Sequence, residues 1–228
     1  MRQNGFCPRA GGDVAWLYVH ALTDAPVPRW TAHGRAIQSV AVGNIFAVGE
    51  RRAEPPQLSE NELRFQHAVV VRVASRVPAV LPARFGSLID DEALASIIRQ
   101  RQLIVDEAMT RVRGRIQMTL RTSTANRTNS TTTAAARGSR PVSGKQYLER
   151  RGKEASTRLS PRLESLIAGT TEYVDAELRQ ATPAGSVVLY HLLKRRHVKA
   201  YRTVFESARG VRVSGPWPPF AFVPELWS

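Results

Sequence analysis

Residues 187–193 run Val-Val-Leu-Tyr-His-Leu-Leu, an apolar stretch with the length and composition of a buried β-strand. Directly after it, residues 195–208 carry apolar side chains at helical spacing, and Gly210 ends the predicted helix. Residues 211–213 predict a last strand, and alternating apolar and polar residues over 116–121 predict an earlier one. Helices and strands in this order predict a small α+β unit.

The segment before this unit suggests where the chain divides. Residues 123–142 are rich in Thr, Ser, Asn and Ala and lack apolar periodicity, so they predict a flexible linker. Residues 145–180 favour a long helix with a break near Pro161. We therefore expect two α+β domains, an N-terminal one at 13–122 and a C-terminal one at 143–228.

The N-terminal half begins with strand patterns. Residues 14–19 predict a buried strand, and residues 36–50 predict two short strands. The Gly43-Asn44 pair between these two short strands is typical of a hairpin turn.

Two helices are predicted after these strands. Ser59 can cap a helix that runs to about residue 76, and Glu62 lies three residues later, as in a capping box. A second helix is predicted from Asp90 to Val112, because carboxylates favour its start and apolar residues recur at helical spacing. Together these elements predict a small mixed sheet with two helices.

Composition excludes several classes of protein. The chain has 228 residues, 43% of them hydrophobic, which is enough to bury a core. It shows no apolar run long enough for a membrane span and no secretory signal, and Cys7 is its single cysteine. These features favour a soluble cytoplasmic protein without an intrachain disulfide.

The net charge is strongly positive. Lys and Arg number 33 against 19 acidic residues, a net charge of +14, and residues 115–158 hold ten basic residues against two acidic ones. Such an excess suggests an anionic partner, and a nucleic-acid-binding protein is the alternative function that this pattern supports. Solvated charges without a partner would produce the same composition.

Motifs for catalysis are weak. Residues 138–146 approximate a phosphate-binding loop, but five residues separate the glycines and Gln146 stands where Ser or Thr should be. The five histidines show no helical zinc-site spacing. We expect no enzymatic activity, no cofactor and no metal site, and an enzyme with an unrecognised site is the weakest alternative.

Three stretches nevertheless resemble one family. They are Val-Leu-Pro-Ala-Arg-Phe-Gly-Ser-Leu at 80–88, Ser-Gly-Lys-Gln-Tyr-Leu-Glu-Arg-Arg at 143–151 and Gly-Pro-Trp-Pro-Pro-Phe-Ala-Phe-Val at 215–223. In this order they resemble the gas vesicle protein F/L family, and the last stretch is the most specific. The linker at 123–142 is longer than is usual in that family, and many members are acidic.

The resemblance implies two α+β domains, of which the C-terminal one is ferredoxin-like. It implies a non-catalytic accessory protein of gas vesicle assembly. Such a protein would bind the small apolar shell protein during nucleation and remain a minor vesicle component. Its partners would be the shell protein and other vesicle accessory proteins, and its location would be the gas vesicle, assembled in the cytoplasm.

The matching stretches supply the candidate site residues. Residues expected to shape the loops are Pro82, Arg84, Phe85, Gly86, Gly215, Pro216, Pro218 and Pro219. Residues expected to contact the shell protein are Trp217, Phe220, Phe222, Trp227, Arg150 and Arg151. Prolines stiffen the closing segment, so its aromatic rings can present apolar surface at low entropic cost. The alternative is that this segment is a clasp that packs on its own domain.

Overall fold

The computed structural model describes residues 16–122, 159–182 and 186–226. The chain forms two compact units, Met1–Met109 with Pro224–Ser228 and Thr110–Val223. The expected linker at 123–142 lies outside the described residues. The division at residues 109 and 110 differs from the expected boundary at 122, and the strand partners described below give the reason.

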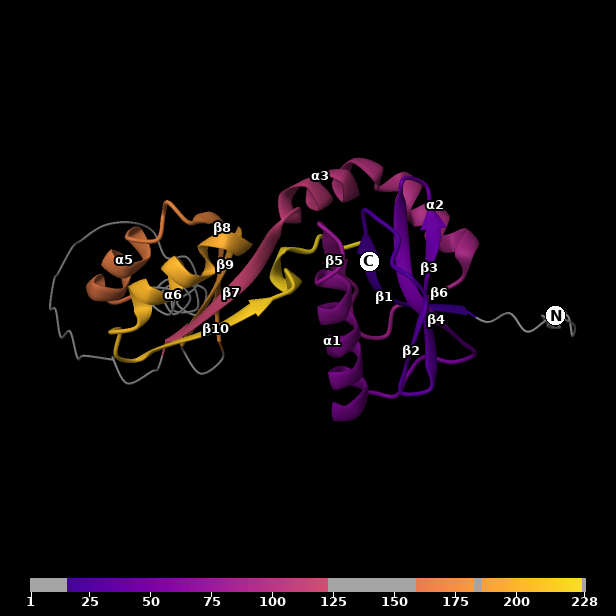
Figure 1. Ribbon diagram of the computed structural model, residues 1–228, viewed down its shortest axis with the longest axis horizontal. Coiled ribbons are helices and arrows are strands. Elements are labelled where there is room, and N and C mark those ends of the chain that lie inside the picture. The colour runs from indigo at the N-terminus through magenta and orange to yellow at the C-terminus, as the bar shows by residue number, and fades with distance from the viewer. Residues whose placement is uncertain (1–15, 123–158, 183–185, 227–228) are drawn as a thin grey trace, which may run out of the picture. The chain divides into compact units, whose positions relative to one another are not determined.

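The first unit contains one antiparallel sheet (Figure 1). Its strands are β1 (Trp16–Thr23), β2 (Trp30–Ala32), β3 (Arg35–Val42), β4 (Ile45–Arg52), β5 (Val80–Pro82) and β6 (Leu88–Ile89). The order is β2-β3-β4-β1-β5, with β6 also paired to β1. The expectation of a mixed sheet is therefore wrong among the described strands, because apolar alternation reveals a strand but not its direction. The predicted turn at Gly43 is confirmed, and Gly43 has a φ of 63°.

Three helices belong wholly or mainly to this part of the chain: α1 (Glu60–Ala74), α2 (Asp91–Gln100) and α3 (Gln102–Val112). The predicted caps at Ser59 and Asp90 are confirmed, because their side chains accept hydrogen bonds from the backbone N–H groups of Glu62 and Ala93. The second predicted helix is in fact two, since α2 ends at Gln100 and α3 begins at Gln102. None of the described helices is long and apolar enough to span a membrane.

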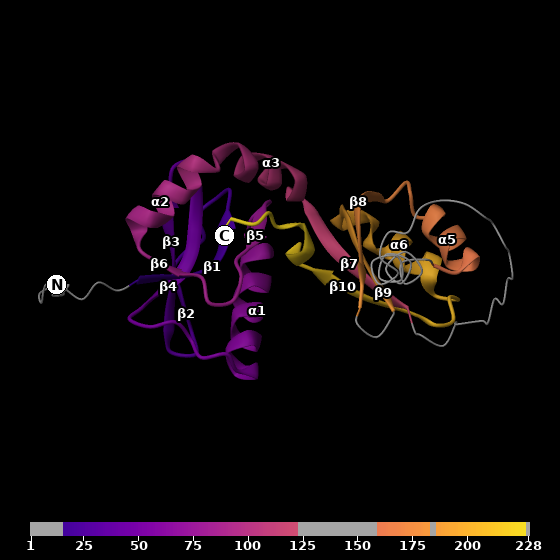
Figure 2. The ribbon, with the colours of Figure 1, turned by 180° about the vertical axis from the view of Figure 1, so that it is seen from behind.

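The second unit contains a four-stranded antiparallel sheet (Figure 2). Its elements are β7 (Arg115–Thr122), α5 (Pro161–Ala168), β8 (Val174–Ala181), β9 (Val187–Lys194), α6 (Val198–Phe205) and β10 (Val211–Trp217). The strand order is β10-β7-β9-β8. Short 3-10 turns at Arg195–His197 and Phe220–Phe222 precede α6 and follow β10.

Two sequence expectations fail in the second unit. The expected domain boundary at 122 is wrong: the strand at 115–122 pairs with β9 and β10 in the second unit, in line with the alternative that it is an earlier strand of the C-terminal α+β unit. The helix predicted over 145–180 is wrong for residues 174–180, which belong to β8. Glu177, Leu178, Arg179 and Gln180 are good helix formers, and pairing with β9 outweighs this preference.

Helices cover one face of the second sheet. The core on that face contains alternate residues of β7 and β9 together with residues of α5 and α6; its largest buried members are Met118, Leu120, Leu189, Leu193, Tyr201 and Phe205. Positions between these core residues point to the opposite face, which carries Gln117, Leu178 and Tyr190. This opposite face forms the candidate site.

Candidate functional site

Strand β10 contains a sharp backbone feature at Gly215. Gly215 has a φ of 117°, and the Gly215–Pro216 peptide bond is cis. A Cβ atom at Gly215 would lie 2.8 Å from the Gln117 carbonyl oxygen and 2.9 Å from the Met118 sulfur. Glycine is therefore required here both by the backbone conformation and by the available space.

The chain then turns back over the sheet. The backbone N–H of Ala221 donates a hydrogen bond of 2.8 Å to Gln117 Oε1, and Gln117 Nε2 donates to Thr119 Oγ1 at 3.2 Å. Phe222 is buried, with 6% of its surface exposed, whereas Phe220 is 39% exposed. In this segment Ala221 is thus hydrogen-bonded to β7, Phe222 is buried and Phe220 is partly exposed.

A groove lies beside Phe220 on this face of the sheet. It has a volume of about 450 Å³. Its lining residues are Gln117, Leu178, Arg179, Gln180, Tyr190, Phe220 and Ala221. Leu178 is 44% exposed, and the hydroxyl of Tyr190 donates to Gln180 Oε1 at 3.1 Å. The groove therefore combines exposed apolar side chains with an amide rim, which suits an apolar segment of another protein.

The structure places the other predicted contact residues differently. Trp217 is half-buried at the end of β10, and its Nε1 donates to Ser214 Oγ at 3.4 Å. Phe222 is buried, and its expected role as a contact residue stays a prediction. Trp227, Arg150 and Arg151 lie outside the described residues.

The loop at 80–88 is anchored to β1. Pro82 is buried and lies opposite Ala21 in the β1–β5 ladder. The Phe85 ring packs edge-on against the Tyr18 ring, with 6.3 Å between centroids, and it is half-buried. Gly86 has a φ of 88°, and its N–H donates to the Tyr18 hydroxyl at 3.3 Å.

The other predicted loop residues, Arg84 and the prolines of the closing stretch, differ in exposure. Arg84 is exposed and forms an ion pair with Glu225, which follows the closing Pro-rich stretch. Pro218 and Pro219 are buried, whereas Pro216 is exposed. The stiffening of the closing stretch by its prolines stays a prediction.

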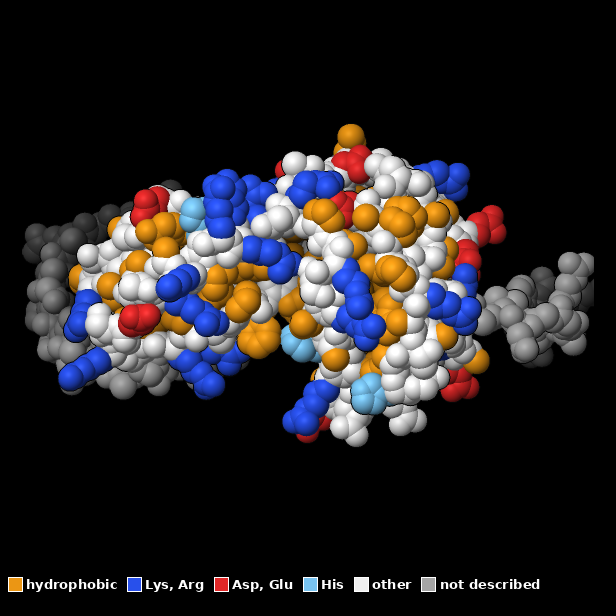
Figure 3. Space-filling view, in the orientation of Figure 1, with side chains coloured by type: hydrophobic (Ala, Val, Ile, Leu, Met, Phe, Trp, Pro, Cys, Tyr) orange, Lys and Arg blue, Asp and Glu red, His pale blue; other side chains and the backbone are white. Residues whose placement is uncertain are grey.

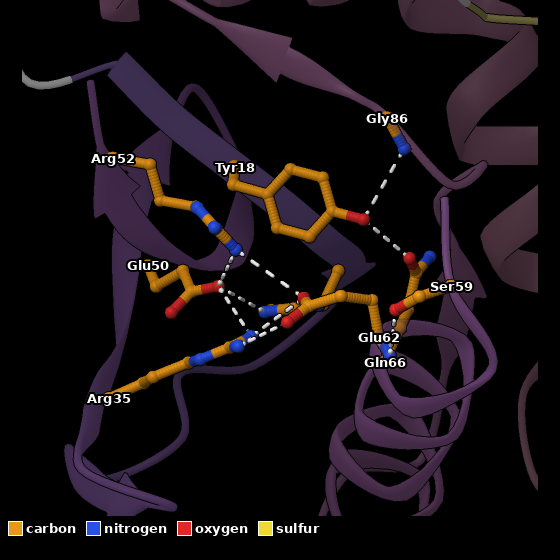
Figure 4. Close-up of polar contacts among 9 residues, drawn as sticks. Tyr18, Arg35, Glu50, Arg52, Ser59, Glu62, Gln66 and Gly86 are labelled. Carbon is orange, nitrogen blue, oxygen red and sulfur yellow. Dashed lines mark hydrogen bonds and ion pairs between the residues drawn. The ribbon is translucent and has the colours of Figure 1, made fainter. Parts of the chain in front are cut away.

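A polar cluster that sequence reasoning missed lies between the first sheet and α1 (Figure 4). Arg35 donates two hydrogen bonds to the Glu62 carboxylate, one of them at 2.8 Å. Arg52 lies 3.2 Å from Glu50 and 3.5 Å from Glu62. Because these four residues come from β3, β4 and α1, no local sequence pattern marks them. Glu62 therefore binds arginines and does not complete the capping box as expected.

Tyr18 extends this cluster. Its hydroxyl donates to Gln66 Oε1 at 2.6 Å, and Gln66 Nε2 donates to the Ala83 carbonyl at 2.9 Å. Burial raises the pKa of Tyr18. The chain of hydrogen bonds ties β1 to α1 and to the residue after β5, so the cluster has a structural role.

Burial shifts the pKa values of two residues in or beside this cluster, Glu50 and His20. His20 is fully buried, and its burial, aided by Arg35 and Arg52, lowers its pKa to about 4. Burial raises the pKa of Glu50, even though Arg35 and Arg52 favour its charged form. A cavity of about 430 Å³ adjoins Glu50 and is lined partly by Arg29, Arg35, Arg51 and Arg52. Among the described residues, no group of three or more His, Cys, Asp or Glu side chains could hold a metal ion.

Comparison with known families decides the identity of the chain. The family described as gas vesicle synthesis protein GvpL/GvpF matches residues 16–224. The chain belongs to this family. The resemblance drawn from residues 80–88, 143–151 and 215–223 is therefore confirmed, and the GvpL/GvpF match includes both the groove and the polar cluster.

Solved structures agree with the assignment to GvpL/GvpF. The crystal structure of GvpF from Anabaena sp. PCC7120 has a TM-score of 0.65 and 13% identity, and the match covers 92% of this chain and 98% of that chain. GvpF from Microcystis aeruginosa has a TM-score of 0.64 and 11% identity, with coverage of 91% and 98%. These likenesses show a shared fold. A comparison with curated protein sequences found no match.

Proposed function

We propose that this chain is a non-catalytic accessory protein of gas vesicle assembly that binds the small apolar shell protein as vesicles form in the cytoplasm. Membership of the GvpL/GvpF family supports the role in assembly. We further assign the second unit to the ferredoxin-like arrangement, because its described elements follow the order strand, helix, two strands, helix, strand with β7 and β9 central.

The observation that carries the proposal is the groove beside Phe220. A partner that is apolar before it assembles needs an apolar surface to cover it, because apolar burial does not require matched hydrogen-bond geometry. Phe220 and Leu178 supply such a surface, with 39% and 44% of their areas exposed. Burying the exposed part of one aromatic ring contributes about 2 kcal/mol before ordering costs.

The buried neighbours of Phe220 keep it in place. Phe222 and Pro219 anchor the 3-10 turn, and the hydrogen bond from Ala221 to Gln117 fixes its distance from the sheet. A rigid groove loses little conformational entropy when a partner binds. We therefore propose Phe220, Leu178 and Tyr190 as the contact residues and Phe222 as a supporting residue.

Co-purification with the shell protein tests this proposal. The double variant Phe220→Ser with Leu178→Ser should lose most of its capture of shell protein and keep its melting temperature, because both side chains are already exposed. Leu103→Ser on α3 is a matched control, since Leu103 is 84% exposed and lies far from the groove in sequence. Equal capture by the double variant and the control would reject the groove as the contact.

The nucleic-acid alternative also has a structural basis. Exposed basic side chains gather around α6, and Figure 3 shows Lys and Arg spread over the visible face of the second unit. The basic residues from 194 to 209 are Lys194, Arg195, Arg196, Lys199, Arg202 and Arg209, against one acid, Glu206. Binding to duplex DNA that weakens steeply with salt would favour this alternative. Capture of shell protein that survives nuclease treatment would favour the assembly role.

A further inference from the structure

Strand β8 lies at one end of the second sheet. Within the described residues it pairs with β9 on one side, and its position in the order β10-β7-β9-β8 leaves the other side as a sheet edge. Its last four residues, 178–181, are exposed. The outward backbone N–H and C=O groups of an edge strand can pair with a strand from another molecule.

The sequence of β8, Val-Asp-Ala-Glu-Leu-Arg-Gln-Ala at 174–181, is complementary to itself. In an antiparallel pair of two copies related by a twofold axis, one residue faces its own copy. When that residue is Leu178, Glu177 faces the Arg179 of the other copy, and Ala176 faces Gln180. Both charged pairs formed in this register are of opposite sign.

The registers centred on Ala176, Glu177 and Arg179 are unfavourable. Centring the pair on Glu177 or on Arg179 places two like charges directly opposite each other at the axis. Centring it on Ala176 brings Asp175 opposite Glu177, which again juxtaposes like charges. The bulge between Val174 and Ala176 in the β8–β9 ladder also bends the start of the strand, so the straight part begins at Ala176.

We propose that two copies of this chain associate through their β8 edges, with Leu178 facing Leu178 and Glu177 facing Arg179. The two four-stranded sheets then form one continuous sheet of eight strands. Within each copy, Arg179 Nε already donates to Glu177 Oε1 at 2.5 Å, so pairing extends each ion pair into an alternating array across the axis. We assign the edge to a second copy of the chain because, in this register, each Glu177 lies opposite an Arg179 of the other copy.

This arrangement also changes how the grooves of the two copies are placed. Leu178 and Gln180 line the groove, so pairing at Leu178 brings the two grooves next to each other across the axis. The association itself does not depend on the proposed function, because the edge and its charge pattern belong to this chain alone. If the groove holds the shell protein, the pair offers two adjacent apolar sites.

Sedimentation equilibrium of the full chain, without shell protein, tests the association. We expect the average mass to rise from one copy toward two as the concentration increases. Arg179→Glu places two acids opposite each other and Leu178→Lys places two cations at the axis, so each should raise the dissociation constant at least about tenfold. Arg179→Lys and Leu103→Lys should leave it nearly unchanged.

Circular dichroism and thermal melting establish whether each variant is folded. Both disruptive positions are surface positions, with 39% exposure of the Arg179 side chain and 44% exposure of Leu178, so we expect folded variants. A mass of one copy at every concentration would overturn the proposal. A dimer that both disruptive variants leave intact would overturn it as well, because the contact would then lie elsewhere.

Discussion

His20 Nε2 lies 3.9 Å from Glu50 Oε1 inside the first unit. Neither ring nitrogen of His20 has a hydrogen-bond partner among the described residues, and the ring packs edge-on against Tyr18 and Phe65. Burial lowers the pKa of His20 and raises that of Glu50, so each group resists its charged form. Because the folded state resists protonation of His20, this group makes the folded state sensitive to acid, whereas the raised pKa of Glu50 acts in the opposite direction.

Stability should fall as the pH drops from 6.5 toward 4. Above pH 6.5 His20 is neutral in both states and contributes no pH dependence; below it the unfolded state takes up a proton that the folded state, with a His20 pKa of about 4, refuses. The loss attributable to His20 is about 3 kcal/mol at most. Urea unfolding at pH 7, 5.5 and 4.5 measures it.

A His20→Leu variant isolates this effect. Its free energy of unfolding should change less between pH 7 and pH 4.5, since it lacks the group that takes up the proton. The raised pKa of Glu50 opposes the loss at the acidic end, and the lowered pKa of His191 adds to it, but both remain in the variant. Identical pH profiles for the two proteins would contradict the assignment.

Two ion pairs formed by α1, Glu62 with Arg35 and Glu60 with Arg64, should contribute different amounts to the free energy of unfolding. Glu62→Gln should cost about 1–2 kcal/mol of stability, because it removes the paired hydrogen bonds from Arg35 and leaves Arg52 with one fewer partner. Glu60→Gln is the matched control. Its ion pair with Arg64 is about three-quarters exposed on both sides, and its loss should cost less than about 0.5 kcal/mol. Urea unfolding of both variants should reveal this difference, and equal effects would show that the cluster is not a stabilising unit.

Local signals predicted local structure well. Ser59 and Asp90 cap helices as expected, and Gly43 makes the predicted turn, because capping and turn formation involve only near neighbours in sequence. The strand predicted at 116–121 is also confirmed. The family resemblance, which rested partly on the closing stretch at 215–223, is confirmed by the GvpL/GvpF match.

Features that depend on distant partners were missed. The pairing of β7 with β9 and β10, the strand at β8 and the Arg35–Glu62 pair all join segments far apart in the chain. Helix-forming residues in β8 pointed to the wrong structure because tertiary pairing outweighs intrinsic propensity. For the same reason, sequence alone could not tell that Phe222 points inward while Phe220 points outward.

The requirement for glycine at 215 is a further prediction. Gly215→Ala should cost about 2–4 kcal/mol, since it strains the backbone at a φ of 117° and brings Cβ within 2.8 Å of the Gln117 carbonyl oxygen. Gly114→Ala is the control. Gly114 has a φ of 68° but open space around the added atom, so about 1 kcal/mol is expected. Equal losses in thermal or urea unfolding would mean that the close contact is relieved by a small shift.

Photo-crosslinking from the groove tests the central claim most directly. A photoreactive phenylalanine analogue is placed at Phe220 in one protein and at Leu103 in another, and each is produced together with the shell protein. The account predicts a crosslink to the shell protein from position 220 and none from position 103. A crosslink from position 103 alone, or from neither position while the shell protein still co-purifies, would contradict it.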